Sequence, residues 1–207
     1  MSRQIKNIIA ITVFLICIGL INVAGQNIEI EIRGMNAFTF ILIIAVLLQV
    51  IFFIPSFLLK TEKYYDLVGS LTYVTTVSLA YFAVENKTMI DSIIYFYVMV
   101  WALRLGIYLF RRVRNDGKDV RFEKAKRHFF WFLQYWMGQA LWVSLTACAA
   151  IIAILSPEED TLPVLAMVGI ALWLSGFAIE SISDYQKRVF RKENNPIESF
   201  IHTGLWA

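Results

Sequence analysis

The stretch TLPVLAMVGIALWLSGFAIESISDYQKRVFRK, residues 161–192, decides how the rest of the chain is interpreted. Its first nineteen residues, Thr161 to Ile179, carry no charge. That length is about what an α-helix needs to cross the hydrocarbon core of a bilayer. Carboxylates and then cations follow at helical spacing. The stretch therefore predicts a membrane-spanning helix that continues beyond the bilayer as a charged, amphipathic extension.

The composition of the whole chain agrees with this interpretation. Of its 207 residues, 58% are hydrophobic and only 17% are charged, and the mean hydropathy is +0.62. Such values are typical of a polytopic membrane protein, and at this length we expect one transmembrane domain, residues 1–207, surrounded by lipid. A net charge of +3 does not indicate a nucleic-acid partner. The two Cys and two His lack metal-ligand spacing, so we expect no metal.

Six long apolar runs follow one another along the chain. Five carry no charge, and the fourth includes Arg104. These runs do not alternate in polarity as the strands of a membrane barrel do, so they predict an all-α bundle of six transmembrane helices. The runs cover residues 7–28, 34–59, 67–84, 92–110, 128–157 and 161–179. The first resembles a signal peptide, but it is longer than a usual apolar core and is expected to stay as the first helix.

The Lys and Arg residues predict how this bundle is oriented. With six spans, 16 of the 19 cations lie on one side of the membrane, 2 lie on the other, and Arg104 lies within a span. Because cytoplasmic segments carry the excess of cations, both ends of these 207 residues are expected in the cytoplasm. The chain is thus expected in the inner membrane of a bacterium or in the endoplasmic reticulum of a eukaryote.

The charged side chains after Ile179 form a stripe. At about 100° per residue, they fall within a wedge of roughly 100°. An interfacial helix with ion pairs one turn apart explains the cations. It explains the acids poorly, because the helix dipole and the membrane surface both disfavour anions there. Carboxylates so placed are expected to have a partner, such as a ribose hydroxyl, an amide or an arginine. The stripe comprises Glu180, Asp184, Lys187, Arg188 and Arg191.

Arg104 raises a similar question, because it lies about seven residues inside a span. Either its long side chain reaches the headgroups or it faces the bundle interior and binds an anion. The segment that follows, RRVRNDGKDVRFEKAKRH (111–128), holds eight basic and three acidic residues. It is typical of a cytoplasmic loop, and its arginines also suit phosphate oxygens.

Two motifs in residues 183–206, and two earlier segments, carry a resemblance to a known family. SDYQKRVFRK (183–192), followed about a dozen residues later by GLW (204–206), resembles the cytoplasmic segment of the steroid 5-alpha-reductase-like membrane reductases. Those enzymes carry S-D-x-x-x-R-x-x-R-K and then G-L-[WF]. KYYDLVGSLTY (63–73) and WALRLGIYLFRR (101–112) resemble bacterial members of uncharacterised function. The resemblance covers roughly residues 60–207.

This resemblance implies an oxidoreductase of lipid metabolism that uses NADPH to reduce a carbon–carbon double bond in a lipid or steroid-like enone. By match to the family, Asp184, Arg188 and Arg191 would contact the cofactor. Glu180 lies where relatives have a polar cofactor contact, and Arg104 matches an arginine of the fourth-helix motif. Relatives continue after G-L-W with a further segment and a seventh helix, so the 207 residues by themselves are expected to bind NADPH weakly or not at all.

Reduction of an enone also needs an acid near the carbonyl oxygen. Asp66 and Tyr73 are seven residues apart and share a helix face, so they are the candidate catalytic residues. The alternative for Asp66 is that it only caps the third helix.

Two other functions remain open at this point. The first is an enzyme similar to isoprenylcysteine carboxyl methyltransferases, which binds S-adenosylmethionine. That cofactor has no phosphate, so Arg104 and the cationic loop would have no phosphate group to bind. The second is a non-enzymatic scaffold or transporter-like bundle, which predicts no affinity for a nucleotide.

Overall fold

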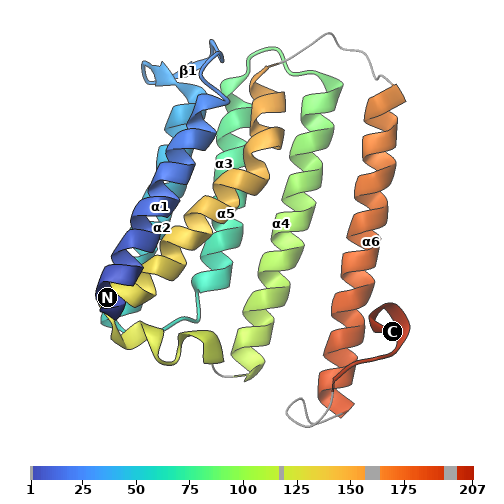
Figure 1. The fold of residues 1–207 in the computed structure, drawn as a ribbon. Coiled ribbons are helices and arrows are strands. Elements are labelled where there is room, and N and C mark those ends of the chain that lie inside the picture. The colour runs from blue at the N-terminus through green and yellow to red at the C-terminus, as the bar shows by residue number, and fades with distance from the viewer. Residues whose placement is uncertain (1, 117–118, 157–163, 194–199) are drawn as a thin grey trace. The chain divides into compact units, whose positions relative to one another are not determined.

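The computed structural model describes residues 2–116, 119–156, 164–193 and 200–207, and within them every long element is a helix (Figure 1). The all-α prediction is therefore confirmed. The chain forms two compact units, residues 1–160 and 161–207. The first contains α1 (Arg3–Val23), α2 (Ala37–Leu58), α3 (Tyr65–Ala83), α4 (Met89–Asp116) and α5 (Phe129–Leu155), and the second contains α6 (Val164–Glu193).

Five of these six helices are long and apolar enough to cross a membrane, namely α1, α2, α4, α5 and α6. The chain is thus an integral, multi-pass membrane protein. The remaining helix, α3, is not among these five, because hydroxyl groups interrupt its apolar surface. It packs instead against α2, α4 and α5. The hydroxyl-bearing side chains of α3, apart from its tyrosines, are Ser70, Thr72, Thr75, Thr76 and Ser78.

Small residues let the helices of the first unit approach one another closely, as is usual between membrane helices. Among the described residues of these α-helices, six alanines are buried: Ala37, Ala45, Ala80, Ala102, Ala140 and Ala147. Larger apolar side chains fill the remaining space, among them Phe38, Ile41 and Ile151. On α3, Thr72 accepts a hydrogen bond from the Gln49 amide at 2.9 Å, which satisfies its buried hydroxyl across the helix contact.

The first unit has two unlike ends. One end holds the start of α1, the α2–α3 connection and the α4–α5 connection, which includes the short helices η1 (Val120–Phe122) and η2 (Ala125–Arg127) (Figure 1). The other end holds the hairpin of β1 (Glu31–Ile32) and β2 (Met35–Asn36) and the α3–α4 connection. Only Arg33 and Lys87 are basic at this second end. The charge asymmetry seen in the sequence therefore runs along the axis of this helix bundle.

The helix boundaries depart from the apolar runs in two places. Helix α1 spans Arg3–Val23 rather than 7–28, because Ser2 caps its start and the chain turns after Val23. The apolar residues that follow are held in the turn by Asn36, whose amide donates to the carbonyls of Gly25 and Ile28. Helix α6 continues past Ile179 to Glu193, as the charged stripe predicts.

Candidate functional site

A cluster of opposite charges forms where the first turn of α3 meets the α4–α5 connection. Arg112 of α4 donates from Nη2 to Asp66 Oδ2 at 3.3 Å, and Arg121 Nη2 lies 3.8 Å from the other oxygen, Oδ1. Arg121 also donates to Asp119 Oδ2 at 2.5 Å, and Arg112 lies 3.9 Å from the same oxygen. We call these four residues the Asp66 cluster. Two carboxylates and two guanidinium groups balance each other there.

A second ion pair, between Lys126 and Glu62, also holds the α4–α5 connection. Lys126 donates to Glu62 Oε2 at 2.6 Å, and the backbone N–H of Asp119 donates to Oε1 at 3.2 Å. The Glu62 side chain is only 3% exposed. A carboxylate buried to this extent needs such partners, because an unpaired charge there would be costly. Glu62 therefore holds the α4–α5 connection against the start of α3 and so positions the Asp66 cluster.

The two carboxyl groups of the cluster differ in proton affinity. Burial raises the pKa of Asp66 above its ordinary value, and the nearby charges of Arg121 and Arg112 only partly oppose this. Burial by itself would also raise the pKa of Asp119. Its hydrogen bonds with Arg121 outweigh that effect, so the pKa of Asp119 is lowered. Asp66 is thus the carboxyl of the pair that keeps a proton to higher pH.

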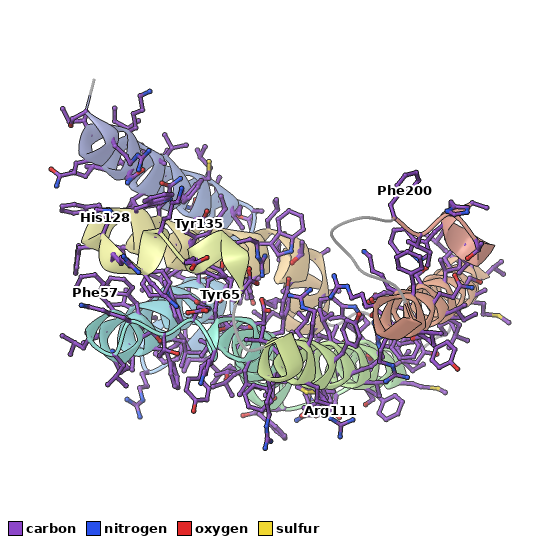
Figure 2. All side chains as sticks on the ribbon, turned by 90° about the horizontal axis from the view of Figure 1, so that it is seen from below. Phe57, Tyr65, Arg111, His128, Tyr135 and Phe200 are labelled. Carbon is purple, nitrogen blue, oxygen red and sulfur yellow. The ribbon has the colours of Figure 1, made fainter. Side chains whose placement is uncertain are left out.

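Asp66 does not cap α3, which was the alternative for it. The N-cap position belongs to Tyr64, whose side chain makes no capping bond. The neighbouring Tyr65 instead donates its hydroxyl to the backbone carbonyl of Tyr135 at 2.9 Å, which ties α3 to α5. Figure 2, viewed from the end of the bundle that holds the α4–α5 connection, labels Tyr65 and Tyr135.

The structure does not bring Tyr73 to Asp66. Seven helical residues separate them, a rise of roughly 10 Å. The Tyr73 hydroxyl lies 2.5 Å from Thr146 Oγ1, and its ring makes an edge contact with Trp101 at 5.0 Å between centroids. Tyr73 therefore sits in the α3–α4–α5 core with its hydroxyl already bonded.

Arg104 lies on α4, two turns back from Arg112, which corresponds to roughly 12 Å along the helix axis. It is half-buried. Arg104 therefore lies outside the Asp66 cluster, and both predictions for its side chain, contact with the headgroups or an anion bound in the bundle interior, stay predictions.

The four remaining predicted cofactor residues, Glu180, Asp184, Arg188 and Arg191, lie on α6 in the second unit. In this unit the short helix η3 (Gly204–Trp206) folds back onto α6. Trp206 Nε1 donates to the Ser183 carbonyl at 3.3 Å, and the Leu205 N–H donates to Gln186 Oε1 at 3.0 Å. The Lys187 ammonium lies 4.1 Å from the centroid of the Trp206 ring. The two motifs that carry the resemblance thus contact each other.

Gly204 is the residue that permits this contact. Its φ is +65°, a conformation that favours glycine. A Cβ at this position would also overlap the Gln186 side-chain amide. The docked segment meets the edge of the charged stripe, since its partners are Lys187, a member of the stripe, and Ser183 and Gln186 beside it.

No pattern in the sequence marks Arg112, Asp119, Arg121, Glu62 or Lys126 individually as a site residue. The segment that holds most of them is distinguished in the sequence only by its excess of cations. One local signal was present: Asp119 stands two residues before Arg121, and its carboxylate also accepts from the Arg121 backbone N–H at 3.0 Å. No local pattern indicates that Glu62 and Asp66 are the partners from α3 and its preceding connection.

Comparison with known families gives one finding. Residues 52–207, more than half of the chain, match a family described as "Protein of unknown function (DUF1295)". The matched range includes α3 to α6, the Asp66 cluster and both motifs of the second unit. No curated protein and no solved structure matches the chain.

Proposed function

The chain belongs to the DUF1295 family, and we propose that this multi-pass membrane protein is an NADPH-dependent oxidoreductase that reduces a carbon–carbon double bond in a lipid or steroid-like enone. The observation that carries the proposal is the contact between η3 and α6. Residues 183–192 and 204–206 resemble two parts of a reductase cofactor segment, and a contact between them supports their acting as one unit.

The side chains of the α6 stripe fit the chemistry of this cofactor. Guanidinium groups suit the 2′-phosphate and the pyrophosphate of NADPH, which Arg188 and Arg191 would meet. The carboxylates of Asp184 and Glu180 accept hydrogen bonds, as a ribose hydroxyl or a carboxamide requires. When bound, NADPH would supply the hydride, and NADP⁺ would be released.

The chain must also supply a proton. Hydride addition to the β-carbon of an enone moves an electron pair to the carbonyl oxygen, and a proton must then reach the α-carbon to give the saturated ketone. We assign this proton to Asp66, because burial raises its pKa, so that of the two carboxyl groups of the cluster it is the one that holds a proton to higher pH. After the transfer, Arg112 and Arg121 would stabilise the carboxylate that remains. Tyr73 is the second candidate, although its hydroxyl is engaged with Thr146.

A binding experiment tests the proposal against both alternatives. The gene product that contains these 207 residues is purified in neutral detergent, and its thermal stability is titrated with NADPH, NADH and S-adenosylmethionine. We expect stabilisation at the lowest concentration with NADPH, because the 2′-phosphate adds charge for the arginines to meet. Stabilisation by S-adenosylmethionine alone would establish the methyltransferase alternative, and stabilisation by none would favour a non-enzymatic bundle.

Asp184→Asn is the informative variant for this titration. Loss of a charge-assisted hydrogen bond costs about 1.5–3 kcal/mol, so NADPH affinity is expected to fall roughly 10- to 150-fold. The melting temperature without ligand should stay nearly unchanged. Glu31→Gln, a change at the hairpin of the first unit, is the matched control and should bind as the parent does. An Asp184→Asn protein with parental NADPH affinity would remove the main support for this site.

A further inference from the structure

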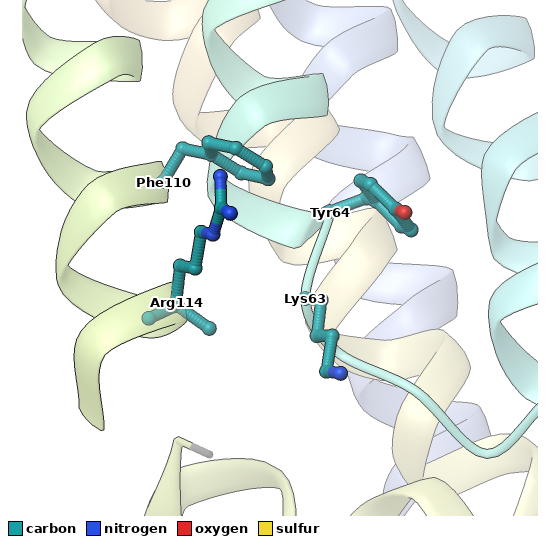
Figure 3. A pocket seen from close by; sticks show the side chains of 5 residues that line it. Lys63, Tyr64, Phe110 and Arg114 are labelled. Atoms are coloured by element: carbon teal, nitrogen blue, oxygen red, sulfur yellow. The ribbon is translucent and has the colours of Figure 1, made fainter. Parts of the chain in front are cut away.

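A cavity of about 300 Å³ opens beside the Asp66 cluster, between the start of α3 and the end of α4. It is lined by Lys63, Tyr64, Phe110, Val113 and Arg114, four of which are labelled in Figure 3. None of the proposed catalytic or cofactor residues lines it. The cavity therefore needs an explanation of its own.

The charged side chains described in this pocket are of one sign. Lys63 and Arg114 supply two cations, and the lining residues that the structure describes include no acidic side chain. Within the described residues, no ion pair involves either of them. Arg112, only two residues before Arg114, instead lies near both Asp66 and Asp119. The pocket thus presents two cations that the described acidic side chains do not neutralise, which favours an anionic ligand.

The walls between the cations are apolar. The rings of Tyr64 and Phe110 stack at 6.3 Å between centroids with an interplanar angle of 22°. Val113 also lines the pocket and is 5% exposed. A small hydrophilic phosphate would leave these rings uncovered, whereas a ligand with a hydrocarbon part would cover them. The ligand is therefore expected to be amphiphilic.

The height of the pocket along the helices agrees with that expectation. Arg114 is the last residue of the apolar stretch of α4 that is long enough to cross a membrane. Lys63 and Tyr64 directly precede α3 at the same end of the bundle. Basic and aromatic side chains at this height meet lipid headgroups and the upper acyl chains.

We propose that this pocket binds an anionic phospholipid. Lys63 and Arg114 contact its phosphate, and Tyr64 and Phe110 contact the upper part of its acyl chains. Basic pockets between membrane helices are known to suit such headgroups. The inference is independent of the NADPH proposal, because it uses different residues and holds whether or not the protein is an enzyme.

The test measures lipid binding to the purified protein in neutral detergent. Native mass spectrometry follows binding of dioleoylphosphatidylglycerol and of dioleoylphosphatidylcholine, and thermal stability is measured with each lipid and with glycerol 3-phosphate. We expect the phosphatidylglycerol to bind about tenfold more tightly than the phosphatidylcholine. The double variant Lys63→Gln/Arg114→Gln should lose about tenfold or more of this affinity.

The control is Lys60→Gln/Arg111→Gln, which also removes two positive charges. Lys60 and Arg111 are exposed and are not among the described residues that line the pocket. It should bind phosphatidylglycerol within about threefold of the parent, because only the general surface charge changes. Tyr64→Ser is a second variant that leaves the charge unchanged, and it should also weaken binding of the lipid. This variant keeps the test valid if the double variant does not fold.

Four results would overturn the proposal. Equal binding of the two lipids would mean that the headgroup charge is not recognised. Equal losses in the pocket variant and the control would mean that the pocket is not the site. Equal stabilisation by glycerol 3-phosphate would indicate a free phosphate ester as the ligand. Displacement of the lipid by NADPH would assign the pocket to the cofactor.

Discussion

At the scale of single residues, the proton affinity of Asp66 is the property most open to measurement. A carboxyl whose pKa is raised binds its proton more tightly in the folded than in the unfolded protein. Its contribution to stability is therefore largest below the ordinary Asp pKa of 3.8 and falls as the pH rises through the raised value. Asp119, with a lowered pKa, behaves in the opposite way and stabilises the fold above the ordinary range.

We predict that Asp66→Asn changes the pH dependence of stability. Relative to the variant, the parent should lose stability as the pH rises from about 4 toward neutrality. The measurement is the melting temperature in detergent across that range. Asp119→Asn should show the opposite trend. Relative to this variant, the parent should gain stability as the pH rises toward the ordinary Asp pKa. A constant difference between Asp66→Asn and the parent would show that burial does not perturb this carboxyl.

Glu62 provides a second prediction at this scale. Glu62→Gln keeps the shape of the side chain but leaves Lys126 without its buried partner, so we expect a loss of about 1–3 kcal/mol in the free energy of unfolding. Denaturant or thermal unfolding in detergent measures it. Glu31→Gln, at the exposed hairpin, should change stability by less than about 0.5 kcal/mol. Equal effects would mean that the Glu62–Lys126 pair does not hold the α4–α5 connection.

At the scale of elements, the docking of η3 on α6 depends on one glycine. Gly204→Ala places a Cβ in a left-handed conformation and against Gln186, so it should weaken docking by about 1–2 kcal/mol. Hydrogen exchange at the Leu205 N–H, which Gln186 binds, is expected to become about 5- to 30-fold faster.

The matched control for this prediction lies on the same helix. At Gly176 a Cβ would meet no atom of the described residues within 4 Å. Gly176→Ala should therefore leave exchange at Leu205 unchanged and favour the helix by up to about 1 kcal/mol. If Gly204→Ala left the exchange rate at Leu205 as it is in the parent, the contact between the two motifs would not exist in the protein in solution.

At the scale of the whole molecule, the cationic end of the first unit predicts its orientation in the membrane. In a background without Cys17 and Cys148, the variants Lys124→Cys and Asn86→Cys place one exposed thiol at each end of the bundle. In intact cells, a maleimide that cannot cross membranes should label the thiol at residue 86 only, because the cationic end faces the cytoplasm. Labelling at residue 124 alone would reverse the topology.

The hydrophobic pattern of the sequence was sufficient to predict the helices, because the length and polarity of a run are local properties. It was sufficient for all six helices and for the charged continuation of α6 past Ile179. The pattern did not predict that α1 ends at Val23. It also did not predict that α3 falls outside the five helices that are long and apolar enough to cross a membrane. Those features depend on contacts that the local pattern does not contain, such as the hold of Asn36 on the turn after Val23.

The candidate site divides in the same way. The sequence alone placed the α6 stripe on one face and marked Asp66 as a carboxyl of interest, since helical spacing determines both. Only the tertiary structure decided that Asp66 meets Arg112, 46 residues away, and that Glu62 meets Lys126, 64 residues away. The physical reason is that an ion pair forms wherever packing brings its members together, and the packing of α3, α4 and α5 is a property of the assembled bundle and of no single segment.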